Sequence, residues 1–334
     1  MPRLNPNLFL DEDYEVYADR HELAKSRSHP QPKRPPDEVA SQADGIESAQ
    51  FTYNASRHER LWIMSSLRNF YDLQWLTDVL RLVKGGKEAS IYLCQAGSSV
   101  AAPDLAAKIY RPRMFRSLKN DHLYREGRAD LDADGTVILD DGKLHAMQKR
   151  TSFGQDLLHT SWIEHEFKTL ELLHQAGVDV PVPYAAGDNA ILMEYVGGKE
   201  LAAPGLNSVE LDLPEACRLF QRVLRDIELM LAHDRVHGDL SAYNILYWDG
   251  KIKLIDFPQA VSPRENHNAY RIFVRDVTRV CEYFMAQGVR CSPRKIARDL
   301  WTSYRLPLAP EVDPRWLDDQ NEADLAYWKK NRKS

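Results

Sequence analysis

The sequence predicts an α+β fold, in which a strand-rich N-terminal lobe and a helix-rich C-terminal lobe join at a glycine hinge. Strand patterns concentrate in the first part of the chain: apolar and other residues alternate in "DLAAKIY", and "NAILMEYV" is an apolar run. Helical spacing of apolar residues dominates later, over about 214–233 and much of 269–334. Two consecutive glycines follow "NAILMEYV", so we place the hinge near residues 196–198.

The N-terminal lobe should contain helices and a small group of strands. Apolar residues recur at helical spacing from about residue 56, and "RLVKGGKEASIYLCQA" reads as strand, glycine turn and strand. Residues 111–135 are charged and aperiodic, and "TVILDDGKLHAMQK" at 136–149 predicts a hairpin that turns at Asp141-Gly142. A helix over about 161–176 should end at Gly177.

A polar, proline-rich stretch precedes the folded part. Residues 1–50 hold too little apolar surface to offset the entropy of ordering, so we predict that they are disordered. The rest divides into a helical extension (51–79), an N-lobe (80–195), a C-lobe (196–310) and a C-terminal helical tail (311–334).

Composition excludes several classes of protein. The net charge of −5 argues against a positive field over the whole surface that would attract nucleic acid. The 43% of hydrophobic residues suffices for a sizeable core. The four cysteines form no C-x-x-C pair, which argues against a zinc site or a disulfide framework. No apolar run approaches the roughly 18 residues of a membrane span, and the N-terminus lacks a signal-peptide layout. We therefore expect a soluble, cytoplasmic protein without a membrane partner.

The segment "RVHGDLSAYNILYWDGKIKLIDFPQ" collects three acid or amide side chains. Asp239 lies on a loop after a helix, Asn244 begins a strand five residues later, and Asp256 ends the apolar run "KIKLID". Oxygen ligands of this kind suit Mg²⁺, and a carboxylate outside the metal shell can accept a proton from an attacking hydroxyl. Kinase phosphoryl transfer divides its tasks in this way. An ordinary turn rich in Asp and Asn is the alternative, but "HGD" and Asp256 together favour a phosphotransferase.

A phosphotransferase of this kind needs a strand lysine and a helix carboxylate. Lys108 points away from the apolar face of "DLAAKIY", which favours a phosphate-contacting lysine over an edge-strand lysine. Two carboxylates compete for its partner. Ser161 and Glu164 match a capping box and place Glu164 on a polar face, whereas Glu166 shares the apolar face. We therefore predict an ion pair between Lys108 and Glu166.

Two backbone segments are candidates for nucleotide contact. The turn formed by Gly85, Gly86, Lys87 and Glu88 can bring N–H groups near phosphates, but it matches neither G-x-G-x-x-G nor the Walker pattern. The strand from Met193 through Glu194 to Val196 would offer backbone groups to adenine, although a plain buried strand explains it equally well.

The ordered set of motifs resembles the RIO family of atypical protein kinases. It comprises "KGGKEASIY", "AAKIYRP", "EHEFKTLELLHQAGVDVPVP", "ILMEYVGGKELAAPGL", "VHGDLSAYNIL", "LIDFPQAV" and "NAYRIFVRDVTRVCEYF", over roughly residues 80–290. The resemblance implies a trimmed protein-kinase-like bilobal fold, with ATP and Mg²⁺ (Mn²⁺ being the alternative ion) bound between the lobes. "DFP" in place of DFG argues against a movable activation segment.

The resemblance also implies roles for individual residues. Asp239 looks like the catalytic base, Asn244 and Asp256 like metal ligands, and Lys108 like the lysine that contacts ATP. Asp256 also matches the family position that accepts a phosphoryl group as an aspartyl-phosphate. A ribosomal-subunit or RNA partner is implied by resemblance only; the basic run from Lys108 to Arg128 would suit RNA, but we favour a solvated loop.

Three functions fit these motifs. The first is a RIO-type serine/threonine protein kinase or ATPase that uses ATP and Mg²⁺. The second is a small-molecule phosphotransferase of the aminoglycoside or choline kinase type, which also uses H-G-D-x-x-x-x-N; "KGGKEAS" and "DFPQ" favour the first. The third is a nucleotide-gated assembly factor. The catalytic residue types are all present, which argues against an inactive kinase.

Overall fold

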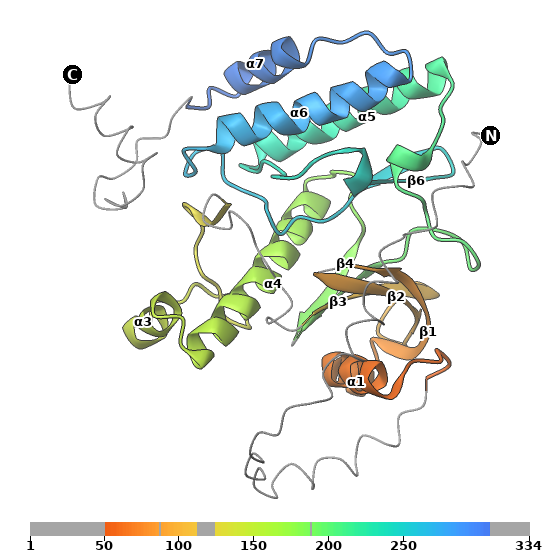
Figure 1. The fold of residues 1–334 in the computed structure, drawn as a ribbon, viewed down its shortest axis with the longest axis vertical. Coiled ribbons are helices and arrows are strands. Elements are labelled where there is room, and N and C mark those ends of the chain that lie inside the picture. Colours follow the sequence, from red (N-terminus) through yellow and green to blue (C-terminus); the bar gives the residue numbers. More distant parts are fainter. Residues whose placement is uncertain (1–50, 87, 112–123, 188, 308–334) are drawn as a thin grey trace, which may run out of the picture.

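The computed structural model describes residues 51–86, 88–111, 124–187 and 189–307 (Figure 1). The segment predicted to be disordered, Lys87, most of the basic run and the predicted C-terminal tail lie outside these residues. Within them, the main sheet lies in the N-terminal part and the C-terminal part is mainly helical, so the predicted α+β organisation is confirmed.

An antiparallel sheet of five strands forms the N-terminal lobe, in the order β1-β2-β3-β5-β4. The sheet begins inside the region predicted as a helical extension. Its strands are β1 (Leu76–Gly85), β2 (Ala89–Ala96), β3 (Asp104–Tyr110), β4 (Pro183–Gly187) and β5 (Ala190–Glu194).

Helix α1 (Arg57–Asp72) covers one face of the sheet, as Figure 1 shows. The Ser56 side chain accepts a hydrogen bond from the Glu59 N–H and so caps the start of the helix. Alternation along β3 turns one set of its residues toward α1. This apolar core contains Ile63, Leu67 and Phe70 of α1 with Leu105, Ala107 and Ile109 of β3.

Two helices follow β3 where a hairpin and a shorter helix were predicted. The Asp140 Oδ1 atom accepts a hydrogen bond from the Lys143 N–H at 2.7 Å and caps α3 (Asp141–Gln148). The hairpin prediction for 136–149 is therefore wrong, because the Asp-Gly pair occupies a first helical turn. Helix α4 (Ser152–Gln175) starts at its cap Thr151, well before residue 161, and ends near Gly177 as predicted.

Helix α4 belongs to both lobes. Its middle turns pack under the sheet, where Trp162, Ile163 and Phe167 contact the Tyr110 side of β3. Its last turns place Leu170 and Leu173 in the larger core of the C-terminal lobe. Side chains on the middle of α4 therefore lie where the two lobes meet.

Helices and one short hairpin build the C-terminal lobe, at the opposite end of the molecule from α1 (Figure 1). The elements are the 3-10 turns Leu206–Ser208 and Ala242–Asn244, α5 (Leu213–Ala232), β6 (Ile245–Trp248), β7 (Lys251–Leu254), α6 (Ala269–Ala286) and α7 (Pro293–Ser303). No helix in the described part of the chain has the length and apolar character needed to cross a membrane.

Candidate functional site

The loop that carries Asp239 follows α5 and is fixed by His237. Burial lowers the pKa of His237, although the carboxylates of Asp276, Asp256 and Asp239 oppose that shift. In the neutral ring, Nε2–H donates to the Ile255 carbonyl oxygen at 3.1 Å, and Nδ1 accepts from the Asp239 N–H at 3.3 Å. The imidazole therefore holds the backbone at Asp239 against the strand end that leads to Asp256.

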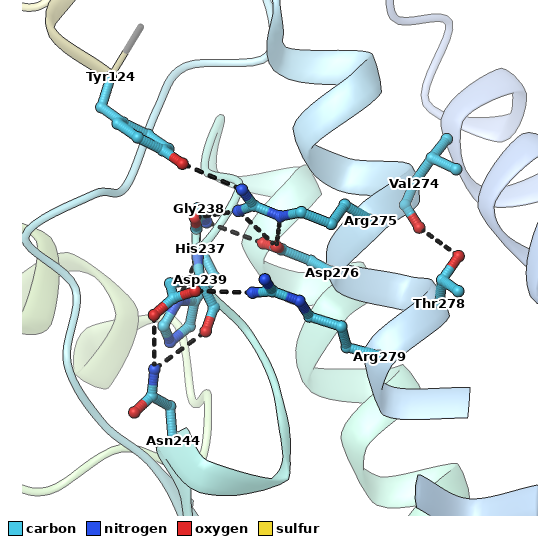
Figure 2. Close-up of polar contacts among 10 residues, drawn as sticks. All are labelled: Tyr124, His237, Gly238, Asp239, Asn244, Val274, Arg275, Asp276, Thr278 and Arg279. Atoms are coloured by element: carbon cyan, nitrogen blue, oxygen red, sulfur yellow. Dashed lines mark hydrogen bonds and ion pairs between the residues drawn. The ribbon is translucent and has the colours of Figure 1, made fainter. Parts of the chain in front are cut away.

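Helix α6 holds the same loop from the other side (Figure 2). The Gly238 N–H donates to Asp276 Oδ2 at 2.9 Å, and the Gly238 carbonyl oxygen accepts from Arg275. Gly238 has φ +87°, and a Cβ atom here would lie 2.0 Å from the Gln259 carbonyl oxygen. Only glycine fits this position, and both of its backbone polar groups are fixed.

The carboxylate of Asp239 lies between two side chains (Figure 2). Its Oδ1 atom accepts from Arg279 Nη1 at 2.8 Å, and Oδ2 lies 3.3 Å from Asn244 Nδ2. Asn244 Nδ2 also donates to the Asp239 carbonyl oxygen at 2.9 Å. The Asp239 side chain is 43% exposed, so this carboxylate is open to an incoming group.

The β6–β7 hairpin brings Asn244 and Asp256 to one end. Ile245 pairs with Leu254, and the Ile255 N–H donates to the Asn244 carbonyl oxygen at 3.0 Å. Asp256 has φ +73°, which is uncommon for a residue other than glycine and marks a backbone held in place by its surroundings. Its side chain is 44% exposed.

Lys108 lies between carboxylates of the two lobes. Its Nζ atom is 2.6 Å from Glu166 Oε1 and 2.6 Å from Asp256 Oδ1, so the predicted Lys108–Glu166 ion pair is present. Burial alone would lower the pKa of Lys108, but the two carboxylates raise it above its ordinary value. Partial desolvation likewise opposes ionisation of Asp256, yet the Lys108 cation holds the pKa of that carboxyl below its usual range. The edge-strand alternative is wrong, because β3 pairs with β2 and β5.

Glu166 has a second partner that the sequence did not indicate. The Tyr110 hydroxyl donates to Glu166 Oε2 at 2.5 Å, and its ring packs edge-on against Trp162 with centroids 5.0 Å apart. The Glu166 carboxylate is thus satisfied on both oxygens although its side chain is only 4% exposed.

The predicted capping box at Ser161 and Glu164 is wrong. Both residues lie inside α4 and both are buried. Ser161 Oγ instead accepts from the Leu131 N–H at 3.0 Å, because the turn around residues 130–137 covers this side of the helix. Burial raises the pKa of Glu164 to about 7, with nearby carboxylates adding to the effect and Lys168 opposing it.

The glycine turn after β1 is held by Arg111. Arg111 Nε donates to the Gly86 carbonyl oxygen at 2.6 Å, and the Arg111 N–H donates to the Glu88 carbonyl oxygen at 2.8 Å. A Cβ atom on Gly86 would lie 2.9 Å from the Ala89 carbonyl oxygen, whereas one on Gly85 would meet nothing within 4 Å. Gly85 therefore leaves open space beside the turn.

The segment after β5 offers a backbone donor at Val196. Met193 pairs with Ala106, and the Glu194 N–H already donates to the Val182 carbonyl oxygen at 2.8 Å. The Val196 carbonyl oxygen accepts from Ala203, while the Val196 N–H has no acceptor among the residues that the structure describes.

Asn244 and Asp256 are the side chains whose chemistry suits Mg²⁺. The described residues hold no group of three or more His, Cys, Asp or Glu side chains arranged for a metal. Asn244 and Asp256 supply oxygen ligands at one end of the hairpin, and Mg²⁺ commonly takes one or two carboxylates together with substrate phosphates and water. These two side chains fit an ion that arrives with a nucleotide.

Besides Tyr110, three residues of α6 that hold the Asp239 loop were not singled out from the sequence: Arg275, Asp276 and Arg279. Asp276 alone carried a signal, because it lies on a helix face otherwise lined by Ile272, Phe273 and Val280, and a buried carboxylate needs a partner. The arginines appear as ordinary polar positions.

Comparisons with known proteins agree with this geometry. The model of the RIO domain family matches residues 122–296. The chain is 26% identical over 240 residues to the RIO-type serine/threonine-protein kinase Rio1 of Methanocaldococcus jannaschii, covering 72% of this chain and 71% of that protein. It is 33% identical over 135 residues to Rio1 of Thermoplasma acidophilum, covering 40% and 69%. Among solved structures, the Rio2 kinase–ADP/Mg²⁺–phosphoaspartate complex of Chaetomium thermophilum matches with a TM-score of 0.51 and 19% identity, over 89% of this chain and 79% of that one.

Proposed function

This chain belongs to the RIO family of serine/threonine-protein kinases, and we propose that it transfers the γ-phosphoryl group of ATP through the site around Asp239 and Asp256. One observation carries the proposal: Lys108 of the sheet contacts Glu166 and Asp256, and Asp239 lies exposed on the adjoining loop. Lys108 thus joins a carboxylate of α4 to a carboxylate of the C-terminal lobe, as the proposed transfer requires.

Each side chain has a stated task in the proposed transfer. Lys108 would contact the nucleotide phosphates, with Glu166 keeping its ammonium in place. The open space at Gly85 admits phosphates near the turn, and the Val196 N–H would donate to adenine. Mg²⁺, when bound, would neutralise charge on the phosphates, and Asn244 and Asp256 would hold it.

Asp239 would act as the general base. The hydroxyl oxygen of a serine or threonine attacks the γ-phosphorus, the bond from that phosphorus to the ADP oxygen breaks, and the hydroxyl proton passes to an Asp239 oxygen. An aspartyl-phosphate route is the variant of this chemistry. An Asp256 oxygen attacks the γ-phosphorus, the bond from that phosphorus to the ADP oxygen breaks and ADP leaves; water later attacks the phosphorus, which releases inorganic phosphate and restores the carboxylate. The solved complex of the Rio2 kinase contains a phosphoaspartate together with ADP and Mg²⁺, which supports this route.

The proposal is tested with γ-labelled ATP and Mg²⁺. Wild type, Asp256→Ala and the control Asp249→Asn, at the opposite end of the same hairpin, are incubated and then treated with acid or base. Base-labile label that disappears only in Asp256→Ala supports the aspartyl-phosphate, and acid-stable label on serine or threonine supports direct transfer to protein. Absence of label together with phosphorylation of a small alcohol contradicts the proposal in favour of a small-molecule kinase.

The cytoplasmic location and the ribosomal-subunit or RNA partner stay predictions. Residues 112–123 of the basic run that would suit RNA lie outside the described part of the chain.

A further inference from the structure

Two arginines one helical turn apart on α6 reach the loop that carries Asp239, but they are used differently (Figure 2). Each of the three Arg275 nitrogens makes at least one contact, with the Tyr124 hydroxyl, the Gly238 carbonyl oxygen and the Asp276 carboxylate as partners. Arg279 makes one contact, from Nη1 to Asp239 Oδ1 at 2.8 Å. Arg275 is therefore part of the framework, and Arg279 has donors to spare.

The spare donors of Arg279 lie beside the proposed base. Among the residues that the structure describes, Arg279 has no acceptor other than Asp239. Its side chain is 42% exposed, and that of Asp239 is 43% exposed, so solvent and ligands reach the pair. Asn244 occupies the far oxygen of Asp239. A hydroxyl that hydrogen-bonds to Asp239 therefore arrives next to a guanidinium with unused N–H groups.

We propose that Arg279 selects acceptors that carry an anionic group, a carboxylate or a phosphate, beside the serine or threonine hydroxyl. A guanidinium presents its N–H groups as a planar fork that binds such anions through paired hydrogen bonds. The inference rests on the proposed phosphoryl transfer and names the substrate class of that site. The nucleotide is the less suitable anion. Arg279 contacts Asp239, whereas Lys108, which would bind the nucleotide phosphates, contacts Asp256, the proposed metal ligand.

The test uses three serine peptides that differ only in the residues flanking the serine: glutamate, phosphoserine or glutamine. Wild type, Arg279→Ala, Arg279→Lys and the control Arg294→Ala, an exposed arginine on α7, are compared by kcat/KM for each peptide. Wild type should prefer at least one anionic peptide over the glutamine peptide by about tenfold, as expected for one partly exposed charge-assisted contact. Arg279→Ala should bring that ratio close to one, Arg279→Lys should keep part of it, and Arg294→Ala should keep all of it.

The ratio of kcat/KM between an anionic peptide and the glutamine peptide separates selection of the acceptor by Arg279 from positioning of the base Asp239. Arg279→Ala is expected to change the rate on every peptide, because it also removes a contact to Asp239. An equal loss on all three peptides overturns the proposal and leaves Arg279 a positioning residue. A raised KM for ATP with an unchanged peptide ratio also overturns it. Preference for one anionic peptide over the other identifies the anion as carboxylate or phosphate.

The same experiment distinguishes this inference from the proposed function. If wild type labels itself or a peptide but shows no anionic preference, the inference about Arg279 fails and phosphoryl transfer stands. If wild type binds ATP but transfers the label neither to a peptide, nor to itself, nor to water, both the inference about Arg279 and the proposed phosphoryl transfer fail.

Discussion

Replacing Glu166 with glutamine should lower the free energy of unfolding by weakening the hydrogen bonds that the Glu166 carboxylate accepts. Glu166 accepts from Lys108 at 2.6 Å and from Tyr110 at 2.5 Å, and its side chain is 4% exposed. Glutamine can keep both hydrogen bonds, since its oxygen still accepts from Lys108 and its amide can donate to the Tyr110 oxygen. What is lost is the charge that strengthens them, and Lys108 keeps Asp256 as a counter-ion.

The expected loss follows from the strength of the two hydrogen bonds. Bonds to charged groups contribute about 1.5–3 kcal/mol and neutral ones about 0.5–1.5 kcal/mol. The Tyr110 bond becomes neutral and the Lys108 bond loses one of its two charges, so the free energy of unfolding should fall by about 2 kcal/mol. Urea denaturation followed by circular dichroism, without nucleotide, measures this change.

Glu171→Gln is the matched control on the same helix. Glu171 is 33% exposed and pairs with Lys168, which is 48% exposed, so its substitution should cost less than about 0.5 kcal/mol. Equal destabilisation by the two substitutions would refute the reasoning, because it would mean that the buried charge at Glu166 adds nothing beyond a surface pair.

Four further predictions concern the same region. Asp239→Asn should abolish transfer and leave ATP binding nearly intact, because the shape survives without the base; retained activity would remove Asp239 from the mechanism. Lys108→Ala should weaken nucleotide affinity, measured by titration calorimetry, and unchanged affinity and rate would contradict its proposed contact. Gly238→Ala should cost more than about 2 kcal/mol on urea denaturation, since its Cβ would lie 2.0 Å from the Gln259 carbonyl oxygen at φ +87°; a stable, active variant would count against this packing. Glu164→Gln should stabilise the protein by on the order of 2 kcal/mol at pH 8, because the pKa of Glu164 is raised from 4.5 to about 7 in the folded state. The contribution of Glu164 to stability is present below pH 4.5 and is lost as the pH rises to 7, where the buried carboxyl ionises. An unchanged curve of stability against pH would contradict this.

The parts of the site that lie on regular periodic elements could be predicted from the sequence. Side chains along β3 alternate between its two faces, which separated Lys108 from its apolar neighbours. The repeat of 3.6 residues along α4 placed Glu166, rather than Glu164, on the helix face that meets Lys108. Each inference needed only the local backbone geometry, and the observed ion pair confirms the result.

The parts that failed depend on distant segments. Glu164 looked exposed because nothing in its own helix shows that the turn at Gly135 covers it. A Cβ atom at Gly135 would lie 3.6 Å from Glu164 Oε2. The Asp-Gly pair at Asp141 suits a hairpin turn and a helix start equally well, and the cap at Asp140 decided between them. Arg279 reaches Asp239 across 40 residues of chain, a separation that local patterns do not report.

The ion pairs of Lys108 also affect how a nucleotide would enter. One ammonium ties Glu166, on the helix beneath the sheet, to Asp256, on the C-terminal lobe, so the two halves are preorganised before any ligand arrives. Little conformational entropy then remains to be lost on association. We expect association kinetics with a single phase whose rate rises linearly with nucleotide concentration, without the plateau that a slow closing motion would impose.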